Sequence, residues 1–252
     1  MKIISYVLYG KNKLYNNGAY LNSMMAKKYY PDFKVWIYIS RPDDIEHDTY
    51  IKLCNLDNVK IINMNCNGVD ISKMLWRYIP LFNDDDLEII IVRDLDSALD
   101  NARDLYAIKN WIDSDCKYHI VRDHPSHAKV HIMGGVFGAK GNHLCKYKEL
   151  FNNFLNDCTR TGSYSNNIMS RRAFESFFSD ELNAYGLDQT FLKMFLYDKI
   201  IGESLIHFSE DSVKNYPNKK FKQIDTDKCK NFQIIPNNIK SKYIGSKEPF
   251  DT

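Results

Sequence analysis

Residues 88–97 read EIIIVRDLDS, a short β-branched run that ends in two aspartates spaced one residue apart. The run predicts a strand that is buried on both faces of a sheet. In open α/β sheets, ligands bind beyond the carboxyl ends of the strands, where Asp94 and Asp96 would emerge. A divalent cation carrying a phosphorylated ligand would offset the cost of placing two carboxylates side by side. An isolated pair of this kind more often caps the next helix and faces water. The rest of the chain must therefore show whether this pair is a cap or a binding site.

The composition is that of an ordinary globular protein with 252 residues, 44% of them hydrophobic, and a formal net charge of +2. Since acids and bases nearly balance and no long run of one sign occurs, we expect no nucleic-acid partner. The six cysteines lack metal-type spacing, which is typical of free thiols in a reducing compartment. The start is too quickly polar for a signal peptide, and no segment is long enough to span a membrane. We therefore expect a soluble, cytoplasmic protein, and its many Lys, Asn, Ile and Tyr residues suggest an AT-rich genome, such as that of a virus or parasite.

Predicted strands and helices alternate through the first half of the chain. The strands are expected at 3–9, 33–40, 59–64 and 89–92, and the helices at 14–29, 42–53, 70–81 and 101–112. This alternation predicts a mostly parallel sheet with helices on both faces. Right-handed crossovers would place the loops after the first and fourth strands on one edge of the sheet. Tyr9 and Gly10 should therefore border a common crevice with residues 94–97.

The second half is less regular. We expect strands at 117–121, 130–139 and 200–208, the last one followed by a polar tail, and helices near 144–154, from Arg171, and at 187–197. The glycine pair Gly134-Gly135 inside the second of these strands indicates a bulge or a close approach to a ligand. A loop at 159–170, rich in Ser, Asn and Gly, is a candidate lid. Without a repeat or a linker, the chain is predicted to be one domain.

Three further groups of side chains are candidates for chemistry. Residues 121–127 and His131 surround Asp123 with polar groups, and the absence of finger-like Cys spacing favours a substrate pocket over a zinc site. His207 stands near the end of an apolar strand and is either a structural histidine or a third ligand for Mn²⁺, which accepts imidazole as well as carboxylate. Asp188-Gln189 opens a helix, where Asp188 is either an N-cap or a pocket acid.

In chain order, these pieces resemble the retaining glycosyltransferases of family 8 and their relatives, which have the GT-A fold, a Rossmann-like sheet flanked by helices. Asp94-Leu95-Asp96 looks like the family's D-x-D motif, which holds Mn²⁺ or Mg²⁺ against the donor diphosphate. Arg77 matches the place of a donor-contacting arginine. The resemblance covers residues 3–208, most of the chain.

The resemblance continues in the second half. Asp123 falls where the family has an aspartate that lines the donor-sugar pocket, and Gly134-Gly135 lies where it has an Asn-Ser/Ala-Gly segment. Asp188-Gln189 resembles its D-Q motif, and residues 206–208 resemble its V-H-F motif, which makes His207 the implied third metal ligand.

Two departures from the family pattern concern the donor pocket. The family's asparagine before the pocket glycine is absent, and Gly134 takes its place. The Lys-Pro-Trp that follows the family's histidine is also absent after residue 208, which leaves Lys214 or Gly245-Ser246-Lys247 as candidates for binding the diphosphate.

The resemblance implies sugar transfer from a nucleotide-diphosphate sugar, with UDP as the expected nucleotide, to the hydroxyl of a glycan or other acceptor, with retention. Residues 1–115 would bind the nucleotide, and residues 116–252 the sugar and the acceptor. Asp123 and Gln189 would orient the sugar. If the reaction inverts instead, Asp188 is the candidate general base.

Two rival interpretations stay open at this point. Residues 94–99 come near the D-x-D motif of haloacid-dehalogenase-type phosphatases, although that motif normally opens a chain and carries Thr or Val where Ala98 stands. The other rival is an inactive domain that binds a nucleotide or a glycan.

Overall fold

The computed structural model describes residues 1–65, 73–124, 131–161, 187–214, 229, 231–247 and 250. Its strands are β1 (Lys2–Leu8), β2 (Lys34–Ile39), β3 (Val59–Asn63), β4 (Ile89–Arg93), β5 (Tyr118–Arg122), β6 (Val136–Lys140), β7 (Ser204–Phe208) and β8 (Asn231–Ile234). Its α-helices are α1 (Lys13–Tyr29), α2 (His47–Cys54), α3 (Lys73–Trp76), α4 (Ile79–Asn83), α5 (Ala102–Asp113), α6 (Lys148–Thr161), α8 (Leu187–Phe191), α9 (Tyr197–Ile200) and α10 (Glu210–Lys214). Short 3-10 turns lie at Pro42–Asp44, Cys145–Tyr147 and Ile201–Glu203, and a π-helical turn at Leu192–Leu196 joins α8 to α9.

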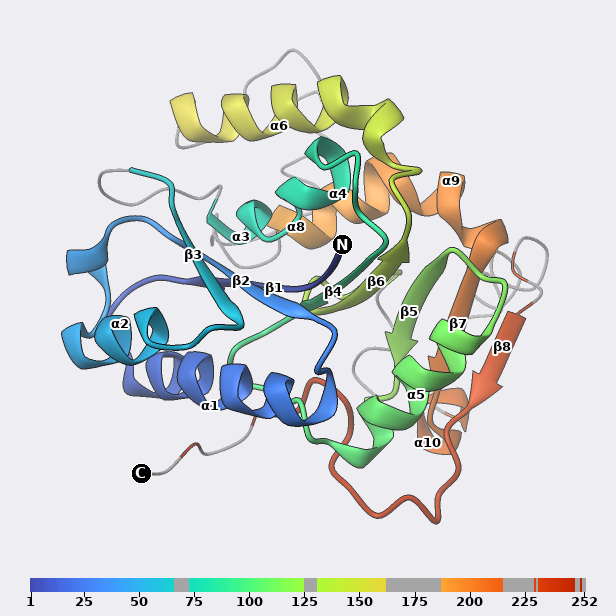
Figure 1. Ribbon diagram of the computed structural model, residues 1–252. Coiled ribbons are helices and arrows are strands. Elements are labelled where there is room, and N and C mark those ends of the chain that lie inside the picture. Colours follow the sequence, from blue (N-terminus) through green and yellow to red (C-terminus); the bar gives the residue numbers. More distant parts are fainter. Residues whose placement is uncertain are drawn as a thin grey trace.

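One sheet of eight strands runs through the molecule in the order β3-β2-β1-β4-β6-β5-β7-β8 (Figure 1). The pairs β1–β2, β2–β3 and β1–β4 are parallel, which confirms the predicted parallel sheet of the first half. β6 is antiparallel to both of its neighbours, β4 and β5. The chain proceeds outward from β1 to β2 and β3, and then returns to place β4 on the other side of β1. The topological switch point, where open α/β sheets bind their ligands, therefore lies between the neighbouring strands β1 and β4.

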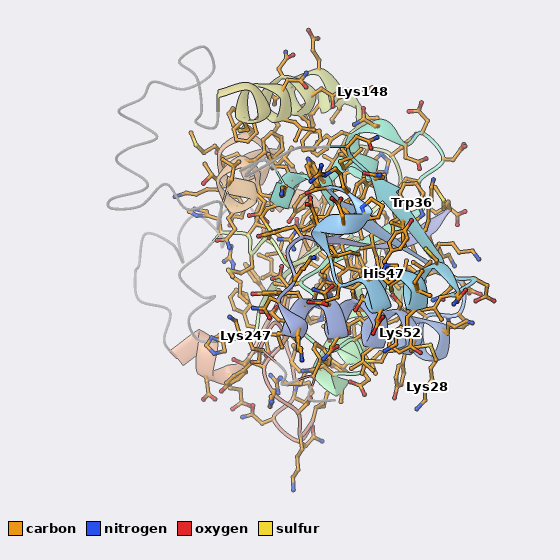
Figure 2. All side chains as sticks on the ribbon, turned by 90° about the vertical axis from the view of Figure 1, so that its left-hand side faces the viewer. Lys28, Trp36, His47, Lys52, Lys148 and Lys247 are labelled. Carbon is orange, nitrogen blue, oxygen red and sulfur yellow. The ribbon has the colours of Figure 1, made fainter. Side chains whose placement is uncertain are left out.

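Helices cover both faces of the sheet (Figure 1). Successive strand residues point to opposite faces, so Ile91 packs in the cluster with α1, α2 and α5, whereas Ile90 packs in the cluster with α3, α4, α6 and α8. Figure 2 views the molecule from the β3 side, with Lys148 of α6 and Lys52 of α2 on opposite sides of Trp36 of β2. None of the described helices combines the length and apolar character that crossing a bilayer would demand.

Two of the strand predictions in the second half were wrong. The strand expected at 130–139 begins only at Val136, because Gly134 and Gly135 pack against acidic side chains of neighbouring elements instead of pairing in the sheet. The tail after β7 contains a further strand, β8, which pairs in parallel with β7. β8 lies at the sheet edge with all four residues exposed. Its sequence, NFQI, does alternate polar and apolar residues, but this short signal was missed within an otherwise polar tail.

The helix predicted at 70–81 is two short helices, α3 and α4, because Pro80 lies in the first turn of α4, where proline favours a new helix start. The helix predicted at 42–53 is likewise a 3-10 turn followed by α2. Residues 159–161 belong to α6, while the rest of the predicted lid and the helix from Arg171 lie outside the described residues. The described cysteines are all free, as expected.

Candidate functional site

The carboxyl ends of β1 and β4 open onto a crevice of about 580 Å³, a size that suits a small-molecule ligand. The sequence predicted that the loops after these two strands border one crevice, and the structure places them there. The lining residues are Val7, Tyr9, Gly10, Lys11, Asn12, Tyr15, Met74, Arg77, Asp94, Leu95, Asp96, Gly135, Asp188, Gln189 and Lys247.

The loop that carries the two aspartates is fixed from both sides. At the end of β4, the guanidinium of Arg93 is buried and binds both oxygens of Asp104 in α5, at 3.0 and 2.8 Å. Across the loop, the side chain of Asn22 in α1 donates to the carbonyls of Leu95 and Ser97, at 3.3 and 3.0 Å. The loop is therefore held before ligand binding, with its carboxylates at the switch point.

Arg77 is the central charge of the crevice. Its buried guanidinium bonds to Asp94 on one side and to Asp188, at 2.6 Å, on the other. Burial alone would lower the pKa of Arg77, but the charges of Asp94 and Asp188 outweigh this effect and hold that pKa well above its ordinary value. Arg77 thereby joins α3, the β4 loop and α8 into one charged unit.

Gly134 and Gly135 provide the space into which these carboxylates fit. A Cβ atom at Gly134 would overlap the carboxylate of Asp188, and one at Gly135 would overlap that of Asp94, far inside the 3.0 Å that real Cβ atoms keep. The backbone carbonyl of Gly134 also accepts a hydrogen bond from the Tyr78 hydroxyl. The close approach indicated by the glycine pair is therefore an approach to acidic side chains of the protein itself.

Asp96 and Lys247 form a second pair of opposite charges in the lining of the crevice. Burial, and then the charge of Asp94, raise the pKa of Asp96, while the Nζ of Lys247, 3.8 Å from its Oδ2, opposes this shift. Figure 2 shows Lys247 apart from the labelled residues of α1 and α2. Asp94 and Asp96 together form an acidic pair that lies between the guanidinium of Arg77 and the ammonium of Lys247.

The wall of the crevice beside β1 is largely aromatic and apolar. The hydroxyl of Tyr9 contacts the Sδ of Met74 at 3.5 Å, and the Nζ of Lys73 lies 5.6 Å from the centre of the Tyr9 ring. Sequence analysis missed Met74 as a lining residue. Its position three residues before Arg77 could have revealed it, because residues at that spacing share a helix face.

His207 does not join the two aspartates. Its ring is buried within β7, where Nδ1 lies 2.9 Å from Nε2 of His119 and Nε2 lies 3.1 Å from Oε1 of Gln233. Both ring nitrogens are therefore occupied, and His207 does not line the crevice. In the described ranges, no group of three or more His, Cys, Asp or Glu side chains is arranged to hold a metal ion. The prediction that His207 is the third metal ligand is therefore wrong.

The histidine pair predicts a loss of stability in acid. Burial lowers the pKa of His207 to about 4 and holds that of His119 well below its ordinary value. Unfolded histidine has a pKa of about 6.5, so the unfolded chain binds more protons between these limits. Stability should be complete above pH 6.5 and fall as the pH drops toward 4, by about 3 kcal/mol from His207.

Denaturant unfolding between pH 7 and pH 4.5 measures this loss. The variant His207→Gln, whose amide can both donate and accept, should flatten the pH dependence, and the exposed His143→Gln should leave it unchanged. An equally steep profile in His207→Gln would contradict the explanation.

Asp123 is also placed away from the crevice. It is fully buried and binds the guanidinium of Arg103 through both oxygens, at 2.9 and 2.5 Å, and its Oδ2 accepts the backbone N–H of Ile244 at 2.8 Å. Its backbone carbonyl accepts the hydroxyls of Ser209 and Ser212. With both carboxylate oxygens occupied, Asp123 cannot line a donor-sugar pocket as predicted.

Some of the remaining predicted residues line the crevice, and others lie outside it. Gln189 lines the crevice, and its backbone N–H donates to Oδ1 of Asp188. The rings of His124 and His131 pack on Tyr243 and Tyr197, outside the crevice lining. Lys214 ends α10, and its side chain is outside the described part of the chain.

The fold is similar to that of the galactosyltransferase LgtC in complex with donor and acceptor sugar analogues, with 10% sequence identity, a TM-score of 0.50, and coverage of 93% of this chain and 85% of that one. An active-site mutant of LgtC is also similar, at 12% identity and a TM-score of 0.47, with the same coverage of 93% and 85%. A mannosyltransferase from Pyrobaculum calidifontis in complex with GDP-Man and Mn²⁺ matches 55% of this chain and 44% of its own, at 12% identity and a TM-score of 0.39. No family model matches the sequence. No curated protein matches it either. The likeness to LgtC shows that the chain has the predicted GT-A fold.

Proposed function

We propose that this chain is a metal-dependent glycosyltransferase that moves a sugar from a UDP-sugar to an acceptor hydroxyl with retention. One observation carries the proposal. The carboxylates of Asp94 and Asp96 meet Arg77, Asp188 and Lys247 in one crevice at the switch point of a GT-A sheet. An acidic pair with cations on both sides suits a nucleotide diphosphate bound together with a divalent ion.

The crevice residues fit Mn²⁺ or Mg²⁺. Both ions prefer hard oxygen ligands, which Asp94 and Asp96 provide. Burial and the charge of Asp94 raise the pKa of Asp96, and a cation bound beside the two carboxylates would offset both effects. When bound, the ion would act as a Lewis acid that offsets the negative charge developing on the leaving diphosphate. His207 takes no part.

The chain's own cations would bind and orient the donor. Lys247 is mostly exposed and can turn from Asp96 toward a diphosphate oxygen. Arg77 is held by two carboxylates and keeps the acidic side chains in position. Tyr9 and Gly10, at the end of β1, would border the nucleotide, as part of the half of the chain up to about residue 115.

Asp188 suits a positioning role better than a general base. Its Oδ2 binds Arg77 at 2.6 Å, and its Oδ1 accepts the Gln189 N–H at 2.8 Å, so both oxygens are occupied. An inverting reaction needs a base with an accessible lone pair near the acceptor. The occupied state of Asp188 therefore favours retention, with Gln189 facing the sugar.

The rivals have less support. A phosphatase of the haloacid dehalogenase type needs its motif on the opening strand and a second acidic pair. Here the motif follows β4, and the acid beside it, Asp188, is paired with Arg77. No observation favours this rival. A non-catalytic binding domain would have the same crevice, and only a measurement of turnover distinguishes it from a transferase.

The test is slow hydrolysis of nucleotide sugars. The protein is incubated with Mn²⁺ and a panel of UDP- and GDP-sugars, and free nucleotide is measured with and without EDTA. We expect cleavage of a UDP-sugar that EDTA stops and that Mn²⁺ restores, and a product of unchanged anomeric configuration once an acceptor is found. Turnover of phosphomonoesters without an effect on nucleotide sugars would refute the transferase. Metal-dependent binding without turnover, even with an acceptor library, would identify a binding domain.

A further inference from the structure

We propose that Asp123 is a positioning residue for donor binding, because it anchors the C-terminal strap, residues 235–247, that brings Lys247 to the crevice. This inference rests on the proposed function for the task of Lys247. It assigns to Asp123 a role at a distance from the crevice, in place of a direct contact with the sugar.

Near its end, the strap is tied to the loop after β5 through the carboxylate of Asp123. Oδ2 of Asp123 accepts the backbone N–H of Ile244 at 2.8 Å and, in addition, the Nε of Arg103 at 2.9 Å. Ile244 and Ile235 are buried with Val121 in a small apolar cluster. The anchor is therefore a buried, charge-assisted contact, which is stronger than an ordinary backbone hydrogen bond.

Contacts of the neighbouring strap residues hold the same segment to α5 and α10. The ring of Tyr243 lies over the guanidinium of Arg103 at 5.7 Å, and its hydroxyl donates to Asp211 at 2.5 Å. Asn101, the N-cap of α5, donates to the carbonyl of Lys242 at 3.0 Å. All of these contacts precede Lys247 by only a few residues.

A tight turn transmits the anchored position to Lys247. Gly245 has a φ of +79°, a conformation that residues with a Cβ adopt at a cost, and the Ser246 N–H donates to the Tyr243 carbonyl at 3.0 Å. Two residues after the glycine, the Nζ of Lys247 reaches to 3.8 Å from Asp96. The lysine position therefore depends on the Asp123–Ile244 contact and on the turn that follows it.

The first experiment measures the anchor without any nucleotide. Asparagine is uncharged and has one acceptor oxygen where aspartate has two. Asp123→Asn therefore cannot keep both bonds to Arg103 together with the bond to Ile244, and the remaining contact is no longer charge-assisted. Hydrogen exchange of the amides in 239–247 should become about 10-fold faster or more in this variant, because local opening costs less. The matched control is Gly138→Ala in β6, whose added Cβ would lie 2.8 Å from the ring of Trp111 on α5, the helix that also carries Arg103. The nearest neighbours of that Cβ include no strap residue. Unchanged exchange in Asp123→Asn would overturn the anchor.

The second experiment measures binding of UDP with Mn²⁺ by calorimetry. Lys247→Ala should weaken binding by about 10-fold, the size of one hydrogen bond to a charged group. Asp123→Asn and Gly245→Ala should weaken it similarly, and neither should weaken it further in the Lys247→Ala background, because both act through the same lysine. Gly138→Ala should bind as the wild type does.

Three outcomes would contradict the inference, in distinguishable ways. Additive losses in the double variants would show that the strap does not act through Lys247. Equal losses in Gly138→Ala would reduce Asp123 to a general stabiliser of the fold. Absence of binding by the wild-type protein would refute the proposed function and, with it, the task of Lys247, while hydrogen exchange would still decide whether Asp123 anchors the strap.

Discussion

Replacing Asp94 or Asp96 with asparagine should lower the rate of nucleotide-sugar cleavage by about 100-fold or more, which is the usual loss when one preorganised electrostatic contact to the transition state is removed. The two variants should differ in stability. Asp94→Asn breaks the pair with Arg77 and should destabilise the fold. Asp96→Asn removes a carboxylate whose pKa is raised by burial, so it should stabilise the fold while it abolishes function.

Gly135→Ala provides a second approach to the same carboxylate. The added Cβ would displace Asp94 without removing it, and this side chain is 39% exposed, so it can turn toward water. We expect a folded variant with weak Mn²⁺-dependent UDP binding. Gly138→Ala in β6 is the control, because its Cβ meets the ring of Trp111 from α5 and should reduce stability without affecting binding.

Donor cleavage, UDP binding and denaturant unfolding are measured for each of these variants. Asp100→Asn, which changes an exposed acid at the end of the same loop, should behave as wild type in all three. Full activity in either Asp94→Asn or Asp96→Asn would exclude these residues as the metal site.

Arg77→Met should reduce the free energy of unfolding by about 3–5 kcal/mol, because it leaves Asp188 as a buried charge without its partner. At this chain length such a loss corresponds to a decrease in Tm of about 10 °C. Activity should also be lost, since Asp94 loses the contact that holds it. Arg41→Met, which removes an exposed ion pair, should change the unfolding free energy by less than about 0.5 kcal/mol.

A double variant separates the charge effect from lost packing. If the unpaired carboxylate is the cause, Arg77→Met combined with Asp188→Asn should regain part of the stability without regaining activity. An equally unstable double variant would assign the loss to the removed volume of the arginine. A stable Arg77→Met single variant would show that the bridge is not needed for folding.

The sequence was sufficient to predict the first half of the fold, because buried parallel strands produce strong apolar runs. It also predicted that the loops after β1 and β4 meet at one edge of the sheet, since right-handed crossovers leave few possible arrangements of the strands. The alternation of polar and apolar residues in β8 was missed, because the segment is only four residues long and lies in a polar tail. The break of a strand at Gly134-Gly135 could not be predicted. In the second case the reason is tertiary: the glycines are required by Asp188 and Asp94, which come from distant parts of the chain.

The candidate site was predicted unevenly for a related reason. Asp94, Asp96, Arg77 and Asp188 meet because each follows or faces a sheet element whose position the pattern indicates. His207 and Asp123 have suitable chemistry and lie at suitable places in the chain, but their side chains are occupied by His119, Gln233, Arg103 and Ile244. Alternation along a strand does not reveal such buried polar partners, which depend on three-dimensional packing.

The strap also affects the order in which the crevice is completed during synthesis. The walls of the crevice combine residues from β1 and the loop after it with Lys247, which is among the last of the described residues to be synthesised. Contacts between segments so distant in the chain close late in folding. A nascent chain can therefore pair β1 with β2 and β4 while the crevice still lacks its lysine. The aspartates are in place well before the lysine that faces them, so competence to hold a donor should arise only after Lys247 has been synthesised.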